Sequence, residues 1–184
     1  MKNFVIILMI LIGSCNFAYA TQNKALKIKL ANTIYELKYS NCTEQSAICM
    51  NEYYKKGEIG FDWTELVTVH YFKNEKDPIG YAEDLAKVSP YSSVIANEET
   101  QRAFLHLVIP AKTENGAYIE QNLFRIEKSP YRKGTTSLQY AKKYSVNNDK
   151  ERKYFKENVN KVQEDYFKYM HLVNIPDIYL KPIQ

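Results

Sequence analysis

The stretch AFLHLVI, residues Ala103–Ile109, is a nearly continuous apolar run with the length of one β-strand. Such a run is typical of a strand that is covered on both faces of its sheet. We therefore expect Ala103–Ile109 to be a central strand. After a turn at Asn115-Gly116, the sequence predicts two more strands, Tyr118–Glu127 and Thr135–Tyr144. The short loop Ser129–Gly134 between them predicts an antiparallel pair.

Further strands are expected upstream of this block. Ala25–Leu30 alternates apolar and basic residues, and Ile34–Tyr39 follows it across Asn32, so the two segments predict a hairpin. Leu66–Phe72 is rich in β-branched and aromatic residues and predicts another strand. Between them, Asn41–Lys56 is expected to hold a disulfide loop and a short segment.

A short helix is expected to begin at Asp77-Pro78 and to end at Ser89-Pro90. Asp can accept the free N–H groups of a first turn, and Pro suits the first helical position. Tyr81, Leu85 and Val88 are spaced to form its buried face.

A long amphipathic helix is expected from Asn147 or Asn148 to Pro176. Its apolar residues, among them Phe155 and Tyr166, recur at helical spacing. A membrane-surface helix would show the same stripe, but packing on the sheet is the commoner case for a C-terminal helix. We therefore predict an α+β fold: a mainly antiparallel sheet of about five or six strands, with one short helix and the long C-terminal helix packed on it.

The first twenty residues have the layout of a secretory signal peptide. Lys2 supplies a positive start, Phe4–Ile12 is an apolar run too short to span a bilayer, and Ala18-Tyr19-Ala20 is a small-x-small cleavage site. We therefore expect residues 21–184 to form one exported domain, periplasmic or extracellular, with no transmembrane span in the mature chain.

A second interpretation of the N-terminus remains open. Ile12-Gly13-Ser14-Cys15 resembles the lipobox of bacterial lipoproteins, with Ile where Leu is commonest. The resemblance implies lipidation at Cys15 and a lipid anchor. Cleavage after Ala20 is the preferred alternative.

Cys42 and Cys49 are the cysteines that remain after such cleavage. In an oxidising compartment, two cysteines predict a disulfide. A metal site is the alternative, but the spacing is not one that zinc sites use and no His lies nearby in the sequence.

Composition and motifs argue against several classes of partner and enzyme but indicate no specific function. The formal net charge of +4 at pH 7 does not demand a polyanionic partner. The chain contains no G-x-S-x-G, H-E-x-x-H or C-x-x-C motif and no glycine-rich phosphate loop. We expect no cofactor and no metal.

His70 and His106 are the catalytic candidates because both lie in expected strands. If those strands are neighbours, two imidazoles could act as an acid–base pair or share a metal, as in a hydrolase or metal-dependent enzyme. The alternative is that each is a hydrogen-bonded histidine of the sheet.

Trp63 and a basic, aromatic segment, Lys128–Tyr154, are the ligand-binding candidates. Trp63 lies between carboxylates and could stack on a sugar, although a lone Trp more often fills the edge of a core. The basic segment includes Arg132, Lys133, Lys142 and Lys143 and could bind a polyanion; the alternative is a solvated hairpin edge, where lysines discourage aggregation.

We therefore expect an exported, non-enzymatic domain that binds a protein partner or an envelope ligand. An enzyme built on His70 and His106 is the first alternative, and polyanion binding through Lys128–Tyr154 is the second. Nucleic acid is not expected as a partner.

Overall fold

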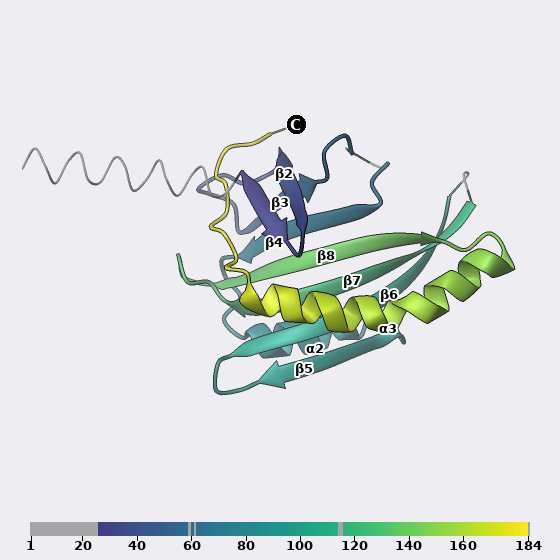
Figure 1. Cartoon of the computed structure of the whole chain (residues 1–184). Coiled ribbons are helices and arrows are strands. Elements are labelled where there is room, and N and C mark those ends of the chain that lie inside the picture. The colour runs from purple at the N-terminus through teal and green to yellow at the C-terminus, as the bar shows by residue number, and fades with distance from the viewer. Residues whose placement is uncertain (1–25, 59, 61, 114–115, 184) are drawn as a thin grey trace, which may run out of the picture.

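The computed structural model describes residues 26–58, 60, 62–113 and 116–183. They form an α+β fold with an antiparallel sheet of eight strands in the order β1-β2-β3-β4-β8-β7-β6-β5 and two helices (Figure 1). The elements are β1 (Lys27–Leu30), β2 (Thr33–Ser40), β3 (Ile48–Tyr54), β4 (Glu65–Phe72), α2 (Pro78–Ala86), β5 (Ser92–Asn97), β6 (Arg102–Thr113), β7 (Gly116–Lys128), β8 (Thr135–Ser145) and α3 (Asp149–Leu172).

The sheet has eight strands, two or three more than the five or six that the sequence predicts. β3 lies within Asn41–Lys56, which was expected to hold a disulfide loop and a short segment but no strand, and β5 is an edge strand of six mostly exposed residues. β6 therefore lies next to the edge and not at the centre. It is nevertheless covered on both faces, because Phe104 packs beneath α3 and Leu105 beneath α2.

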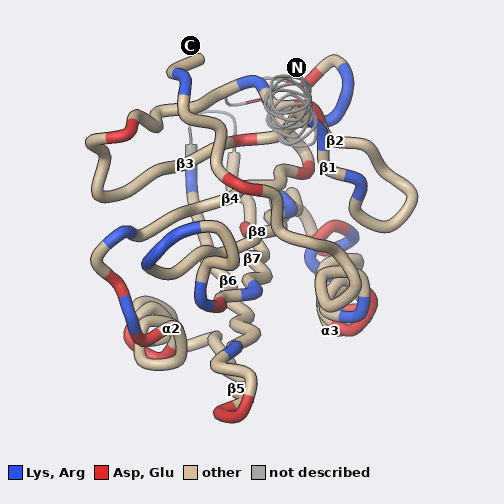
Figure 2. The backbone as a smooth tube through the Cα atoms, turned by 90° about the vertical axis from the view of Figure 1, so that its left-hand side faces the viewer, with Lys and Arg blue, Asp and Glu red and all other residues tan. Residues whose placement is uncertain are grey.

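α2 and α3 cover opposite faces of the sheet (Figure 2). Successive side chains of a strand point to opposite faces of its sheet, and the buried residues of β7 alternate in this way. Leu123 packs in the core on the α3 face, whereas Phe124 and Ile126 pack in the core on the α2 face. A polar side chain on such a strand must therefore find its partners on one face or the other.

α2 begins where the sequence predicts. The Asp77 side chain caps it by accepting the N–H of Gly80 at 3.0 Å. Ile79 belongs to its buried face. Val88 was expected on that face but is 65% exposed, because the helix ends at Ala86.

α3 packs on the sheet, as the sequence predicts. Asn148 caps its first turn. In the C-terminal half, Tyr166 stacks on Tyr140 of β8 with ring centroids 3.7 Å apart, and Phe167 packs against Phe104 of β6 at 5.3 Å. These aromatic contacts fix the C-terminal half of the helix on the sheet.

Arg125 of β7 is a buried cation beneath the C-terminal end of α3, with a side chain only 3% exposed. Its Nη1 donates to the carbonyls of Met170 and Val173, the latter at 2.7 Å, and its Nη2 pairs with Glu127 at 3.2 Å. Burial lowers the pKa of Arg125, and Glu127 opposes that shift. The last carbonyls of a helix lack hydrogen-bond donors within the helix. The Arg125 guanidinium provides donors to carbonyls at this helix end.

The chain after α3 returns to the end of the sheet formed by β1, β2 and β3 (Figure 1, yellow). Ile178 is buried in the core on the α3 face of the sheet. Ser40 and Ile183 exchange backbone hydrogen bonds of 3.1 and 2.9 Å. Cys42 and Cys49 lie at disulfide distance with Cα atoms 4.7 Å apart, which confirms the expected pair.

The expectations for residues 1–20, including the lipobox at Cys15, lie outside the described residues. Within the described part of the chain, neither helix combines the length and the apolar character that a membrane crossing requires.

Candidate functional site

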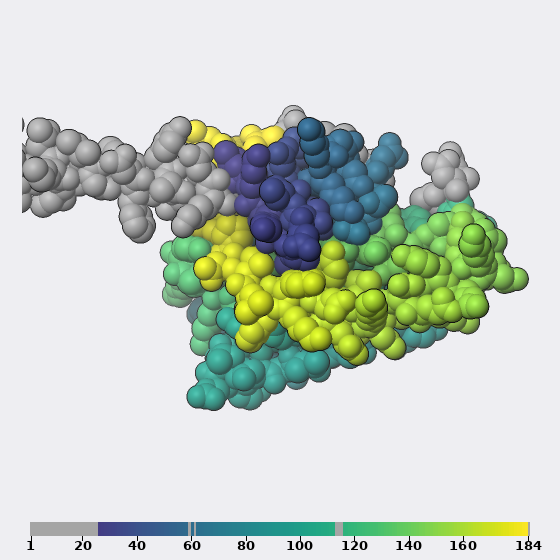
Figure 3. All heavy atoms as spheres, in the orientation of Figure 1, coloured from purple at the N-terminus to yellow at the C-terminus, as the bar shows by residue number. Residues whose placement is uncertain are grey.

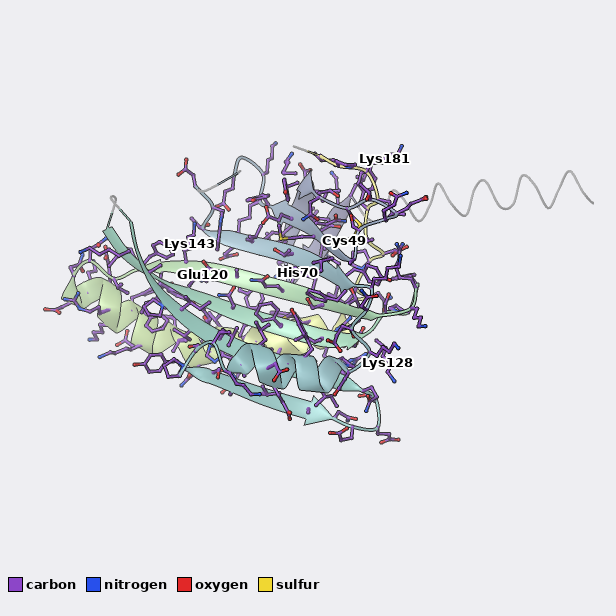
Figure 4. The ribbon with its side chains drawn as sticks, turned by 180° about the vertical axis from the view of Figure 1, so that it is seen from behind. Cys49, His70, Glu120, Lys128, Lys143 and Lys181 are labelled. Atoms are coloured by element: carbon purple, nitrogen blue, oxygen red, sulfur yellow. A yellow bond between two sulfur atoms is a disulfide. The ribbon has the colours of Figure 1, made fainter. Side chains whose placement is uncertain are left out.

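His70 lies on the sheet face opposite α3 (Figure 4). Its Nδ1 is 3.2 Å from Oγ of Ser137, its partner in β8, and its ring stacks on Phe72 with centroids 5.9 Å apart. Burial lowers the pKa of His70 to about 4. The imidazole is therefore neutral at physiological pH and is held by packing and one hydroxyl.

His106 lies on the α3 face and belongs to a chain of hydrogen bonds. Tyr144 donates to Oε1 of Gln121 at 3.0 Å, and Nε2 of Gln121 donates to the carbonyl of Val159 at 2.8 Å. The same Nε2 is 3.2 Å from Nε2 of His106. Because an amide NH₂ can only donate, Nε2 of His106 accepts and its Nδ1 carries the proton. Burial lowers the pKa of His106, which agrees with this neutral tautomer.

The two histidines do not form a joint site. His70 pairs with Ser137 on the face away from α3, whereas His106 pairs across β6 and β7 with Leu123 on the α3 face. The sheet itself separates the two imidazoles, so they cannot act on one substrate atom. Among the residues that the structure describes, no group of three His, Cys, Asp or Glu side chains is placed to hold a metal ion.

An open hollow of about 600 Å³ lies between the N-terminal half of α3 and the β5–β6 edge of the sheet. Figure 3 shows α3 lying along this face above the residues of β5 and β6. The residues that line the hollow include Ser93, His106, Val108, Ile119, Phe155 and Val159.

The local sequence explains why this space is left open. Ser93 is the cross-strand partner of His106, so a small side chain stands where a larger one would meet the helix. Phe155 and Val159 are four residues apart and face the sheet from the helix. Beside the hollow, Phe155 meets the ring of Tyr144 edge-on at 5.2 Å, whereas farther along α3 Tyr166 stacks face to face on Tyr140.

Trp63 and Lys143 are brought together by the structure, on the face away from α3. The Nζ atom of Lys143 lies 3.9 Å from the Trp63 ring centroid and 5.4 Å from that of Tyr118. Burial lowers the pKa of Lys143, while Glu120, beside it in Figure 4, raises it. Trp63 also packs against the cluster that contains Leu66, so it fills the edge of a core.

Lys142 points to the other face of β8. Its Nζ is 3.7 Å from Glu65 and 5.2 Å from the ring centroid of Tyr144. It therefore belongs to a hollow of about 510 Å³ beside the start of α3, whose lining also includes Lys150, Glu151 and Tyr154.

Arg132 and Lys133 lie in the turn between β7 and β8, at the opposite end of the sheet. Arg132 pairs with Asp177 at 2.5 Å and lies over the ring of Tyr71, 5.3 Å from its centroid. The Tyr71 hydroxyl donates to the carbonyl of Lys133 at 2.5 Å. The segment Lys128–Tyr154 is therefore not one continuous basic surface, because β8 separates its two ends by about 30 Å.

Two functional residues were missed by sequence reasoning: Gln121, which orients His106, and Ser93, which leaves the hollow open. Gln121 gave a usable signal, since an amide two positions before Leu123 falls on the same apolar face of a buried strand. Ser93 gave no such signal, because its small side chain leaves space only in relation to His106 on the neighbouring strand β6.

One protein-family model matches the chain, over residues 23–175. No curated protein and no solved structure matches it.

Proposed function

The chain belongs to the protein family whose model matches residues 23–175, and we propose that it is an exported, non-enzymatic domain that binds a small, largely apolar ligand between α3 and β6. The observation that carries this proposal is the hollow of about 600 Å³ with a preset hydrogen-bond donor in its lining. Ligand sites of this size combine apolar walls with a few polar groups that orient the ligand.

The chemistry of the lining specifies the ligand. Val108, Ile119, Phe155 and Val159 provide apolar contacts. His106 has Nε2 engaged by Gln121, so the nitrogen left to meet a ligand is the protonated Nδ1. The matching ligand is an apolar molecule with one hydrogen-bond acceptor.

Binding accounts for this histidine better than catalysis does. A general base needs a free lone pair, and the lone pair on Nε2 of His106 already accepts a hydrogen bond from Gln121. Among the residues that the structure describes, the lining contributes no carboxylate to orient the ring as an acid–base catalyst. The neutral imidazole is thus prepared to donate, which is a recognition role.

A fluorescence titration tests the proposal. N-phenyl-1-naphthylamine is a neutral apolar probe that brightens when it leaves water. We expect the wild-type protein to bind it saturably and Ser93→Phe, which fills the hollow, to lose that binding. Ile95→Phe is the matched control, because Ile95 lies on the same face of β5, is 59% exposed and does not line the hollow.

Equal probe binding by the folded Ser93→Phe and Ile95→Phe variants would place the ligand elsewhere and refute the proposal. Near-ultraviolet circular dichroism and the unfolding midpoint establish that both variants keep the fold.

Export is part of the proposal and rests on residues 1–20. The Cys42–Cys49 pair is compatible with an oxidising compartment. Mass analysis of the protein from its native cell distinguishes the two interpretations of the N-terminus: a chain that begins at Thr21 supports signal cleavage, and an acylated Cys15 supports a lipid anchor. A chain that retains Met1 in the cytoplasm would contradict both.

A further inference from the structure

The turn between β7 and β8 surrounds a second, smaller hollow of about 290 Å³ at the other end of the molecule. Its lining is Lys76, Lys128, Ser129, Arg132, Lys133 and Gly134. Lys76 comes from the loop before α2, Lys128 is the last residue of β7, and the others come from the turn itself. Figure 2 faces this end and shows basic segments in the loops beside α2, and Figure 4 places Lys128 there, far from Lys143.

The turn is held in place by contacts with two other parts of the chain, the C-terminal segment and β4. Asp177 of the C-terminal segment pairs with Arg132, and Tyr71 of β4 donates to the carbonyl of Lys133. Gly134 has a φ of +126°, and a Cβ there would lie 2.4 Å from the carbonyl oxygen of Phe72, so only glycine fits. The backbone that carries the lysines is therefore preorganised, which lowers the entropic cost of binding.

Of the four cations that line this hollow, Arg132 is neutralised by Asp177, whereas the three lysines are not paired with carboxylates. None of Lys76, Lys128 and Lys133 forms an ion pair with any residue that the structure describes. The nearby acidic side chains are engaged by groups other than these three lysines. Asp177 pairs with Arg132, Asp77 caps α2, and Glu75 accepts the backbone N–H groups of Lys76 and Asp77 at 2.8 and 2.9 Å.

The basic hollow beside the start of α3 differs in this respect. Glu151 is part of its lining, and Lys142 pairs with Glu65. Its positive charges are thus partly compensated within the protein. Uncompensated cations that converge on one hollow repel each other, and a bound anion removes that repulsion.

We propose that the hollow at the β7–β8 turn binds a phosphoryl group. A phosphoryl group carries the charge and the oxygen acceptors that lysine ammonium groups bind as point charges. The volume suits a compact anion and is smaller than the hollow beneath α3. This inference goes beyond the proposed function and is independent of it, since the two hollows share none of the described residues.

The group could be free phosphate or the headgroup of an anionic lipid, and the test has one arm for each. Isothermal titration calorimetry measures binding of inorganic phosphate. Flotation measures binding to vesicles of phosphatidylglycerol and phosphatidylcholine in equal parts, with pure phosphatidylcholine vesicles as the uncharged control.

The test variant is Lys128→Gln/Lys133→Gln, and the matched control is Lys150→Gln/Lys153→Gln, which makes the same charge change at the other end of β8. We expect the test variant to weaken binding in the active arm about tenfold or more, since each lost lysine contact is charge-assisted. The control should bind within about twofold of wild type.

Each outcome decides the proposal. Phosphate binding that only the test variant loses supports a site for free phosphate. Vesicle binding that only the test variant loses, without competition by phosphate, supports a headgroup site. Equal loss in both double variants shows dependence on overall charge and overturns the proposal, and so does the absence of wild-type binding in both arms.

Discussion

Replacing Arg125 tests how α3 is fixed to the sheet. In Arg125→Met the apolar stem is kept, while the hydrogen bonds to the carbonyls of Met170 and Val173 are lost. A hydrogen bond to a charged group contributes about 1.5–3 kcal/mol. Part of that loss is offset, because the variant no longer buries a charge. We expect the free energy of unfolding to fall by about 3 kcal/mol.

Urea unfolding followed by circular dichroism measures this change. In thermal unfolding, the midpoint temperature of a chain of this length should fall by about 6–12 °C. Arg102→Met is the matched control. Arg102 also pairs with Glu127, at 2.5 Å, but its side chain is 28% exposed, so the expected loss is below about 1 kcal/mol. If Arg125→Met loses no more stability than Arg102→Met, the buried guanidinium does not hold the helix end.

Three further predictions concern stability. Burial lowers the pKa of His70 to about 4 from 6.5, so between those values the unfolded chain binds a proton that the folded protein does not. The free energy of unfolding should therefore fall as pH drops from 6.5 to about 4, by up to about 3 kcal/mol, and His70→Gln should flatten this slope; an unchanged slope in urea titrations would contradict it. Asn148→Ala removes the cap of α3 and should cost about 1 kcal/mol, whereas Asn158→Ala, within the same helix, should cost less. Cys42→Ser/Cys49→Ser should lose about 2.5 kcal/mol, and wild type under reducing conditions should lose the same amount.

The sequence predicted those elements whose capping residue, strand composition or helical periodicity can be recognised within a short stretch of chain. The cap at Asp77, the strand Leu66–Phe72 and the amphipathic α3 depend on residues close together in sequence, and each lies within a few residues of its expected place. β5 was missed because its sequence, SSVIAN, is short and exposed, and it is a strand only because β6 pairs with it. β3 was missed because its polar residues interrupt the apolar alternation.

The candidate site depended on strand order, which local patterns do not contain. His70 and His106 both lie in strands, as expected, but the pairing of β4 with β8 and of β6 with β7 places them on opposite faces. Local patterns also did not show that the basic residues of Lys128–Tyr154 lie on two separate surfaces. These residues are close in sequence, but an extended strand carries them to opposite ends of the sheet.

Mapping a bound ligand onto the sheet by NMR tests most directly whether the protein binds a ligand between α3 and β6. We would titrate the protein with N-phenyl-1-naphthylamine and follow the His106 ring and the methyl groups of Val108, Ile119 and Val159. We expect saturable shifts at these residues, while the Ile95 methyl groups stay unchanged. Shifts that do not saturate, or that are as large at Ile95 as at Val159, would contradict a binding site between α3 and β6.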